Sequence, residues 1–169
     1  LEFRRVLFRS LMLPINTWKS MIPDSAYTDS THQGLDEESL SQLEFYEGAM
    51  HAMDIFASAN LKIHLSLFDT ENDSALVSDL LRNPVLKELD FIIAAGNQAV
   101  IRKLNQFSLL NKITLLTPTL NSSDILKNNS MAWALSPSSV TQCYEAGKLC
   151  STKFRTSNSI VVKSGVSKE

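Results

Sequence analysis

The side chains able to do acid-base, nucleophilic or metal chemistry are scattered along this sequence without a recognisable catalytic spacing. His32, His51 and His64 are not separated by the intervals typical of metal ligands. No G-x-S-x-G motif exposes a nucleophilic serine, and no histidine has an obvious serine or cysteine partner. The glycine-rich loops that cradle nucleotide phosphates are also missing. We therefore predict no catalytic residue, no metal site, no cofactor and no enzyme activity.

The densest group of oxygen-bearing side chains is residues 69–74, Asp-Thr-Glu-Asn-Asp-Ser. An EF-hand calcium loop needs a central glycine and a glutamate at its twelfth position, where this sequence has Leu80. Asp73 and Ser74 are instead residues that cap the start of a helix. We interpret the segment as a turn that opens a helix.

The two cysteines, Cys143 and Cys150, lie about 10 Å apart along one predicted helix. A disulfide normally needs Cα atoms within about 7 Å of each other. We predict two half-buried thiols, which leave the redox compartment open.

Short apolar runs alternate with longer stretches in which apolar residues have helical spacing. The predicted strands are residues 11–15, 61–68, 91–95, 113–116, 131–135 and 159–163, and the predicted helices are 40–58, 74–81, 97–109 and 140–154. This alternation is typical of βαβ units and predicts an α/β fold with a parallel sheet. Predicted core positions on the helices and the fifth strand are Phe45, Ala49, Ala52, Met53, Phe56, Val100, Ile101, Leu104, Leu110 and Trp133.

The composition of two strands predicts their places in the sheet. Residues 61–68 alternate apolar and polar side chains, as an edge strand does, whereas residues 91–95 are continuously apolar and suit a strand buried on both faces. The doubly wound strand order 2-1-3-4-5 follows, and in such sheets ligands bind beyond the carboxyl ends of the strands. A response regulator of the same order needs acids after the first strand, where this chain has Asn16 and Thr17.

Composition limits the range of partners. The 169 residues are 44% hydrophobic and 20% charged, which is ordinary for one globular domain. The net charge of −2 argues against nucleic acid, which needs clustered Lys and Arg. No apolar run approaches the roughly 18 residues of a membrane span, so we expect membrane contact only through an anchor outside this sequence.

The first ten residues are set aside from the fold prediction. Residues 2–10, EFRRVLFRS, resemble the translation of a sequencing adapter, and such scars are excluded from fold reasoning. The alternative is a basic arm for targeting or nucleic-acid binding. We assign residues 1–10 to the scar and expect the natural gene product to begin upstream.

Several short motifs, taken in order, resemble a known family. They are Leu13-Pro14-Ile15, Phe45-Tyr46-Glu47-Gly48-Ala49, residues 68–73 and residues 90–93, followed by Thr117-Pro118, Ile125-Leu126, residues 135–138 and Gln142. Together they are similar to the first lobe of a type I periplasmic-binding-protein fold over residues 11–163. More narrowly, the chain resembles a bacterial group in which this receptor-like domain accompanies peptidoglycan-binding LysM modules.

The resemblance implies two α/β lobes that close on a ligand between them. Residues 11–138 would form lobe one, and residues 139–169 would begin lobe two. It also implies an extracytoplasmic location, in the periplasm or as an envelope lipoprotein, and a non-catalytic role.

Ligand-facing positions transfer only to the loops at the carboxyl ends of the strands: Asn16, Thr17, Trp18, Asn97, Gln98, Thr117, Thr119, Asn121 and Ser122. In amino-acid-binding members, small hydroxyl residues and backbone amides there hold a carboxylate with help from a helix N-terminus. This chain departs from the family at Ala94-Ala95, where members have Gly-Pro, and at Gln98 or Ala99, where they have serine. The alternative is that these polar residues are only caps and turns.

Two functions remain open at this point. The first is a binding lobe for a small polar ligand, an amino acid or a peptidoglycan fragment, held in an interlobe cleft. The second is a ligand-free scaffold that regulates or tethers cell-wall machinery through a protein partner. Retained polar groups at Thr117 and Asn121 favour the first, and the altered loop at Ala94-Ala95 favours the second.

Overall fold

A computed structural model describes residues 7–17, 37–58, 63–120 and 122–155 of the chain. In chain order its elements are β1 (Leu7–Leu13), α1 (Glu37–Ser58), β2 (Ile63–Asp69), α2 (Ser74–Leu80), the 3-10 helix η3 (Pro84–Glu88), β3 (Phe91–Ala94), α3 (Gln98–Asn111), β4 (Thr114–Thr117), the 3-10 helix η4 (Ser123–Leu126), β5 (Ala132–Ala134) and α4 (Ser139–Lys153). The predicted sixth strand lies outside the described residues.

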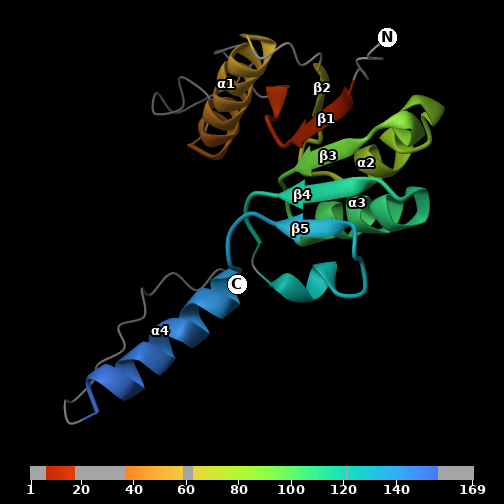
Figure 1. The fold of residues 1–169 in the computed structure, drawn as a ribbon. Helices are drawn as coiled ribbons and strands as arrows, with labels where there is room; N and C mark the ends of the chain where they lie inside the picture. The colour runs from red at the N-terminus through yellow and green to blue at the C-terminus, as the bar shows by residue number, and fades with distance from the viewer. Residues whose placement is uncertain (1–6, 18–36, 59–62, 121, 156–169) are drawn as a thin grey trace, which may run out of the picture.

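The five strands form one parallel sheet in the order β2-β1-β3-β4-β5 (Figure 1), which confirms the prediction. Ser10 pairs with Ser66 on one side and with Ile92 on the other. The register therefore brings the ends of β1, β2 and β3 to one edge of the sheet.

The first strand begins and ends earlier than predicted. It starts at Leu7, so residues 7–10 of the segment set aside as a scar pair with β2 and β3. It ends at Leu13 because Pro14 has no N–H to donate and Asn16 has a left-handed φ of 55°.

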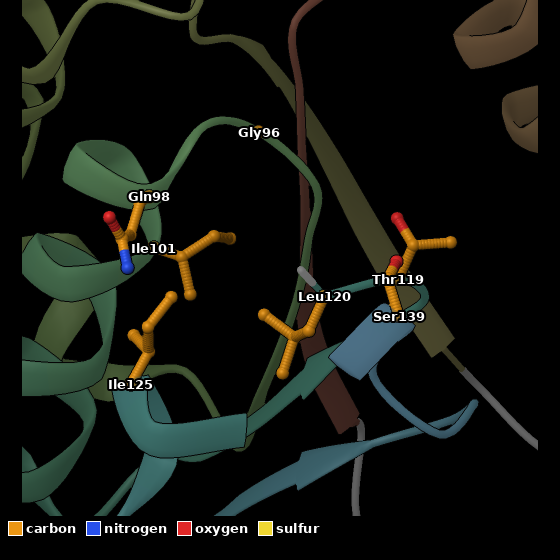
Figure 2. Close-up of a pocket in the computed structure, with 7 residues that line it drawn as sticks. All are labelled: Gly96, Gln98, Ile101, Thr119, Leu120, Ile125 and Ser139. Atoms are coloured by element: carbon orange, nitrogen blue, oxygen red, sulfur yellow. The ribbon is translucent and has the colours of Figure 1, made fainter. Parts of the chain in front are cut away.

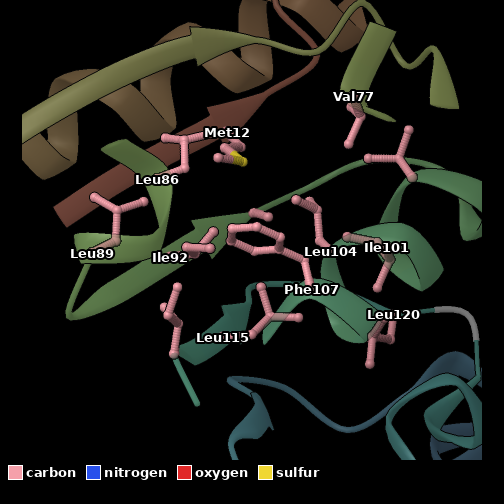
Figure 3. Packing of buried hydrophobic residues seen from close by; sticks show 13 residues of the cluster. Met12, Val77, Leu86, Leu89, Ile92, Ile101, Leu104, Phe107, Leu115 and Leu120 are labelled. Carbon is pink, nitrogen blue, oxygen red and sulfur yellow. The ribbon is translucent and has the colours of Figure 1, made fainter. Parts of the chain in front are cut away.

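Two apolar layers cover the sheet. The larger lies between the sheet and helices α2 and α3, and Figure 3 shows its side chains converging from strands and helices. The smaller joins α1 to the other face through Leu11, Leu13, Ile15 and Ala95. The layers thus hold α1 and α3 on opposite sides of the strand ends.

Four predictions of burial are wrong. Phe56, near the end of α1, is 45% exposed. Leu110 is 73% exposed, because α3 turns Phe107 inward instead. Trp133 on the edge strand β5 is 62% exposed. Cys143 and Cys150 are exposed free thiols, because α4 has no buried residue among those described.

Helix caps fix where the chain leaves each strand end. Asp73 caps α2 by accepting a hydrogen bond from the Ala75 N–H at 2.7 Å, which confirms one of the two predicted caps. Lys112 ends α3 in a left-handed conformation with φ 56°. Asp73 therefore places the first turn of α2 beside the carboxyl end of β2, and Lys112 ends α3 directly before β4.

Candidate functional site at the carboxyl ends of the strands

A small cavity lies beside the carboxyl ends of β3 and β4. Its volume is about 110 Å³, and Figure 2 shows the residues around it: Gly96, Gln98, Ile101, Thr119, Leu120, Ile125 and Ser139. Apolar side chains from α3, η4 and the loop after β4 form its floor, and polar groups stand at its margin. This is the mixture typical of a site for a small ligand.

Two helices begin at this cavity. Gln98 is the first residue of α3, and Ser139 is the first residue of α4. Caps already occupy several first-turn N–H groups: Asn97 Oδ1 accepts from Ala99 and Val100, Ser138 Oγ accepts from Thr141, and Leu120 O accepts from Ser139. The dipole of each helix is nevertheless positive at this end. An anionic group such as a carboxylate is therefore favoured here.

Gly96 allows the chain to pass close to this cavity. Its φ of 150° is one that side-chain-bearing residues rarely adopt, and a Cβ would lie 3.1 Å from Val100 Cγ1 and 3.2 Å from Asn72 Oδ1. The loop between β3 and α3 consequently requires glycine at this position.

A wider groove of about 390 Å³ lies between α1 and the loops after β3 and β4. Its lining is Ser41, Gln42, Glu44, Phe45, Ala95, Pro118 and Thr119. Thr119 lines both the groove and the cavity, so the two hollows are adjacent. Glu44 is the charged residue of the groove lining and favours an ammonium group there.

Of the predicted site residues, Thr119 and Gln98 line these hollows. Asn97 is adjacent to Gln98 in the chain, but its side chain caps α3. Its Oδ1 accepts hydrogen bonds from Ala99 N–H at 2.9 Å and Val100 N–H at 3.0 Å, and its Nδ2 donates to Asn72 O at 2.7 Å.

The side chains of four further predicted residues form hydrogen bonds within the loops and caps of the protein. Asn16 is 6% exposed and donates from Nδ2 to Pro14 O at 3.2 Å, and Thr117 is fully buried with its hydroxyl donating to Thr119 O. The Thr17 hydroxyl donates to Asp69 Oδ2 at 2.9 Å, and Ser122 caps η4. Trp18 and Asn121 lie outside the described residues.

Sequence reasoning missed Gly96, Ser139 and the α1 residues of the groove. The sequence did carry a signal for Ser139, because serine residues are common at helix starts and Ser138-Ser139 precedes a predicted helix. In the structure Ser138 caps this helix, and its Oγ accepts from Thr141 N–H at 3.2 Å. Ser41 and Glu44 carried none, because only the packing of α1 brings them to the loop after β4.

Asp69, the last residue of β2, accepts hydrogen bonds from the loop that follows β1. Its Oδ1 accepts from the N–H groups of Ile15 and Asn16, each at 3.1 Å, and of Glu71 at 3.0 Å. Its Oδ2 accepts from Thr17 N–H at 2.8 Å. Burial raises the pKa of this carboxyl, but the hydrogen bonds from Thr17, Glu71 and Asn16 outweigh it and leave the pKa below its ordinary value.

This lowered pKa predicts a loss of stability in acid. Because the folded pKa lies below the unfolded one, the carboxylate stabilises the fold above about pH 4 to 5, and this contribution is lost as pH falls through the folded pKa. Asp69→Asn should flatten the decline in unfolding free energy between about pH 5 and pH 2, measured by urea titration. Asp124→Asn is the control, because Lys127 lowers the pKa of that carboxyl at a fully exposed site, where ion pairs add little. An equal flattening in both variants would contradict the assignment.

Among residues 7–17, 37–58, 63–120 and 122–155, no group of three or more His, Cys, Asp or Glu side chains could hold a metal ion. None of the described helices combines the length and apolar character needed to cross a bilayer.

Known structures with the same arrangement were found by comparison. An ABC transporter substrate-binding protein from Desulfitobacterium hafniense matches with a TM-score of 0.63 and 12% identity over 88% of this chain. A leucine-binding protein from Thermotoga maritima matches with 0.62 and 14% over 89%. The branched-chain amino acid transporter substrate-binding protein LivJ from Streptococcus pneumoniae, in complex with isoleucine, matches with 0.63 and 10% over 89%. The chain has the fold of one lobe of a type I periplasmic binding protein.

The chain spans about two fifths of the length of its structural neighbours, since the matches cover 39%, 38% and 39% of those chains. No protein-family model matches the sequence. No curated protein matches it either. The identities show the fold alone, and the association with LysM modules stays a prediction.

Proposed function

We propose that this lobe belongs to an extracytoplasmic solute-binding protein and holds a small zwitterionic ligand of the α-amino acid type. The observation that carries the proposal is the convergence of the first residues of α3 and α4 on one cavity beside Thr119. Helix N-termini favour the carboxylate, and Glu44 in the adjoining groove favours the ammonium group.

The solved neighbours support the ligand class. One is in complex with leucine and another with isoleucine. Both have the fold of which this chain represents one lobe, and a second lobe would close the cleft over the cavity. Peptidoglycan fragments also carry carboxylate and ammonium groups, so they belong to the same class of candidate.

The test is a thermal-shift screen of the complete natural gene product against L-amino acids, sugars and muropeptides. A ligand that binds only the folded state raises the melting temperature, because it stabilises that state by RT ln(1 + [L]/Kd). We expect stabilisation by at least one amino acid or muropeptide. Stabilisation by none of them would contradict the proposal and favour the ligand-free scaffold.

Two substitutions assign the binding to this edge. Gln98→Ala and Thr119→Val should each weaken the affinity for the stabilising compound by roughly 10-fold or more, the effect of losing a hydrogen bond to a charged group. Gln106→Ala is the matched control, because Gln106 lies exposed further along α3 and does not line the cavity. Isothermal titration of all three variants measures the difference, and equal affinities would place the ligand elsewhere.

A further inference from the structure

The hydrogen bonds around Asp69 form a closed cradle. Three successive backbone N–H groups, from Ile15, Asn16 and Thr17, point at one carboxylate, with donor–acceptor distances of 3.1, 3.1 and 2.8 Å. Such a concavity of consecutive amides, formed where one residue is left-handed, is a backbone anion site. Here the left-handed residue is Asn16, and the anion is supplied by the neighbouring strand.

The same loop reaches α1. The Asn16 side chain is buried and donates from Nδ2 toward Ser39 Oγ at 3.5 Å. A second polar connection comes from the turn that follows Asp69, where Asn72 Nδ2 donates to Glu38 Oε1 at 3.3 Å. Both connections end on the first turn of α1, directly before Ser41 and Gln42 of the groove wall.

The apolar packing of α1 against the sheet is concentrated in residues 43–49. Leu43, Phe45, Tyr46 and Ala49 pack against the sheet. Beyond them a cavity of about 380 Å³ separates the rest of the helix from the strands, and Phe56 is 45% exposed. The part of α1 after Ala49 therefore adds little to the placement of the helix. The contacts of the first turn then determine the position of the α1 residues that line the groove.

We infer that Asp69 is a positioning residue of the binding groove, which acts through the β1 loop and Asn16 on the first turn of α1. The inference deepens the proposed function, because it names what sets the distance between α1 and the loops after β3 and β4. Asp69 itself does not line either hollow. Its negative charge is held by protein N–H groups, so the β1 loop amides stay occupied and are not left to a ligand.

The first test needs no ligand. In Asp69→Ala, backbone amides of residues 15–17 and 38–42 should exchange with solvent at least 10-fold faster, measured by NMR-detected hydrogen exchange, with α3 unchanged. Asp73→Ala is the matched control, because it removes another carboxylate of the same turn that caps only α2. Unchanged exchange in the first turn of α1 in Asp69→Ala would overturn the inference.

The second test uses conservative rescue. Asp69→Asn keeps one oxygen that can accept from Ile15, Asn16 and Glu71, so it should restore most of the slow exchange that Asp69→Ala loses. Affinity for the probes L-leucine and L-isoleucine should follow the order Asp, Asn, Ala. Accelerated exchange in Asp69→Ala, together with no stabilisation of the unaltered protein by any amino acid or muropeptide of the screen, would refute the proposed function and leave the positioning role intact. Probe binding with equal affinity in all three proteins would refute the positioning role alone.

Discussion

Leu104→Ala is expected to lower the free energy of unfolding by about 2 to 5 kcal/mol. Leu104 is fully buried between α3 and the sheet, among the side chains in Figure 3. Removing three carbon atoms there loses their transfer free energy and leaves a void that neighbours on both sides cannot close. Urea unfolding followed by circular dichroism measures the change in midpoint at constant slope.

Leu110→Ala on the same helix is the control for this substitution. Leu110 is 73% exposed, so the change should stay within about 0.5 kcal/mol. The pair distinguishes the observed orientation of α3 from the one predicted from sequence, which placed both leucines inside. Similar losses for the two variants would show that α3 is rotated from the orientation described.

Ser10→Ala is expected to raise the free energy of unfolding by about 1 to 3 kcal/mol. Ser10 is fully buried in the central part of the sheet, and its hydroxyl has no hydrogen-bond partner among the described residues. A buried hydroxyl without a partner loses its bonds to water on folding, and alanine removes that cost without adding volume. Thermal and urea unfolding of the two proteins give the difference.

Ser108→Ala should change stability in the opposite direction. Ser108 is equally buried, but its hydroxyl donates to Ile113 O at 2.6 Å and accepts from Asn129 Nδ2 at 3.3 Å, and the substitution removes both hydrogen bonds. We expect a loss of about 1 to 3 kcal/mol. A loss in both variants would mean that the Ser10 hydroxyl has a partner, such as an ordered water, and would contradict the argument.

The Ser10 result also bears on the adapter-like segment. Ser10 is its last residue, and Arg9 lies in the cavity under α1 with its guanidinium 5.1 Å from the centre of the Phe91 ring. From Leu11 to Leu13 every side chain is at most 1% exposed and apolar. Stabilisation by Ser10→Ala would support the hypothesis that residues up to Ser10 are foreign to this strand.

The strand order was predictable because a strand buried on both faces has a continuously apolar sequence, whereas an edge strand alternates apolar and polar residues. In the continuous run Phe91–Ala94, Ile92 and Ala94 are buried in the larger core, and Phe91 and Ile93 are partly buried on the α1 face. The alternating run Ile63–Asp69 forms the edge. The orientation of Leu110 and the exposure of Trp133 were not predictable in this way. Both depend on which neighbours cover an element: β5 is an edge strand, and Leu110 lies on the exposed side of α3.

The candidate site was predictable only to the level of the correct edge. Side chains such as Asn97 and Gln98 are adjacent in sequence and equally polar, yet one caps α3 and the other lines the cavity. Local sequence cannot separate these roles, because both kinds of residue follow a strand and precede a helix. Asp69 was interpreted as a turn residue for the same reason. Its partners Ile15 and Asn16 follow the neighbouring strand β1 and lie more than 50 residues earlier in the chain.

The central place of β1 has a consequence for synthesis. Leu7–Leu13 is the first described strand to leave the ribosome, yet its partners are Ile63–Asp69 on one side and Phe91–Ala94 on the other. Strands so distant in the chain pair slowly, because the entropy of closing a long loop is lost before the stabilising contacts form. In a nascent chain this apolar strand therefore has no partner until residue 69 has emerged, and its β3 side stays unpaired until residue 94 has emerged. During that interval it is exposed to aggregation, against which chaperones act.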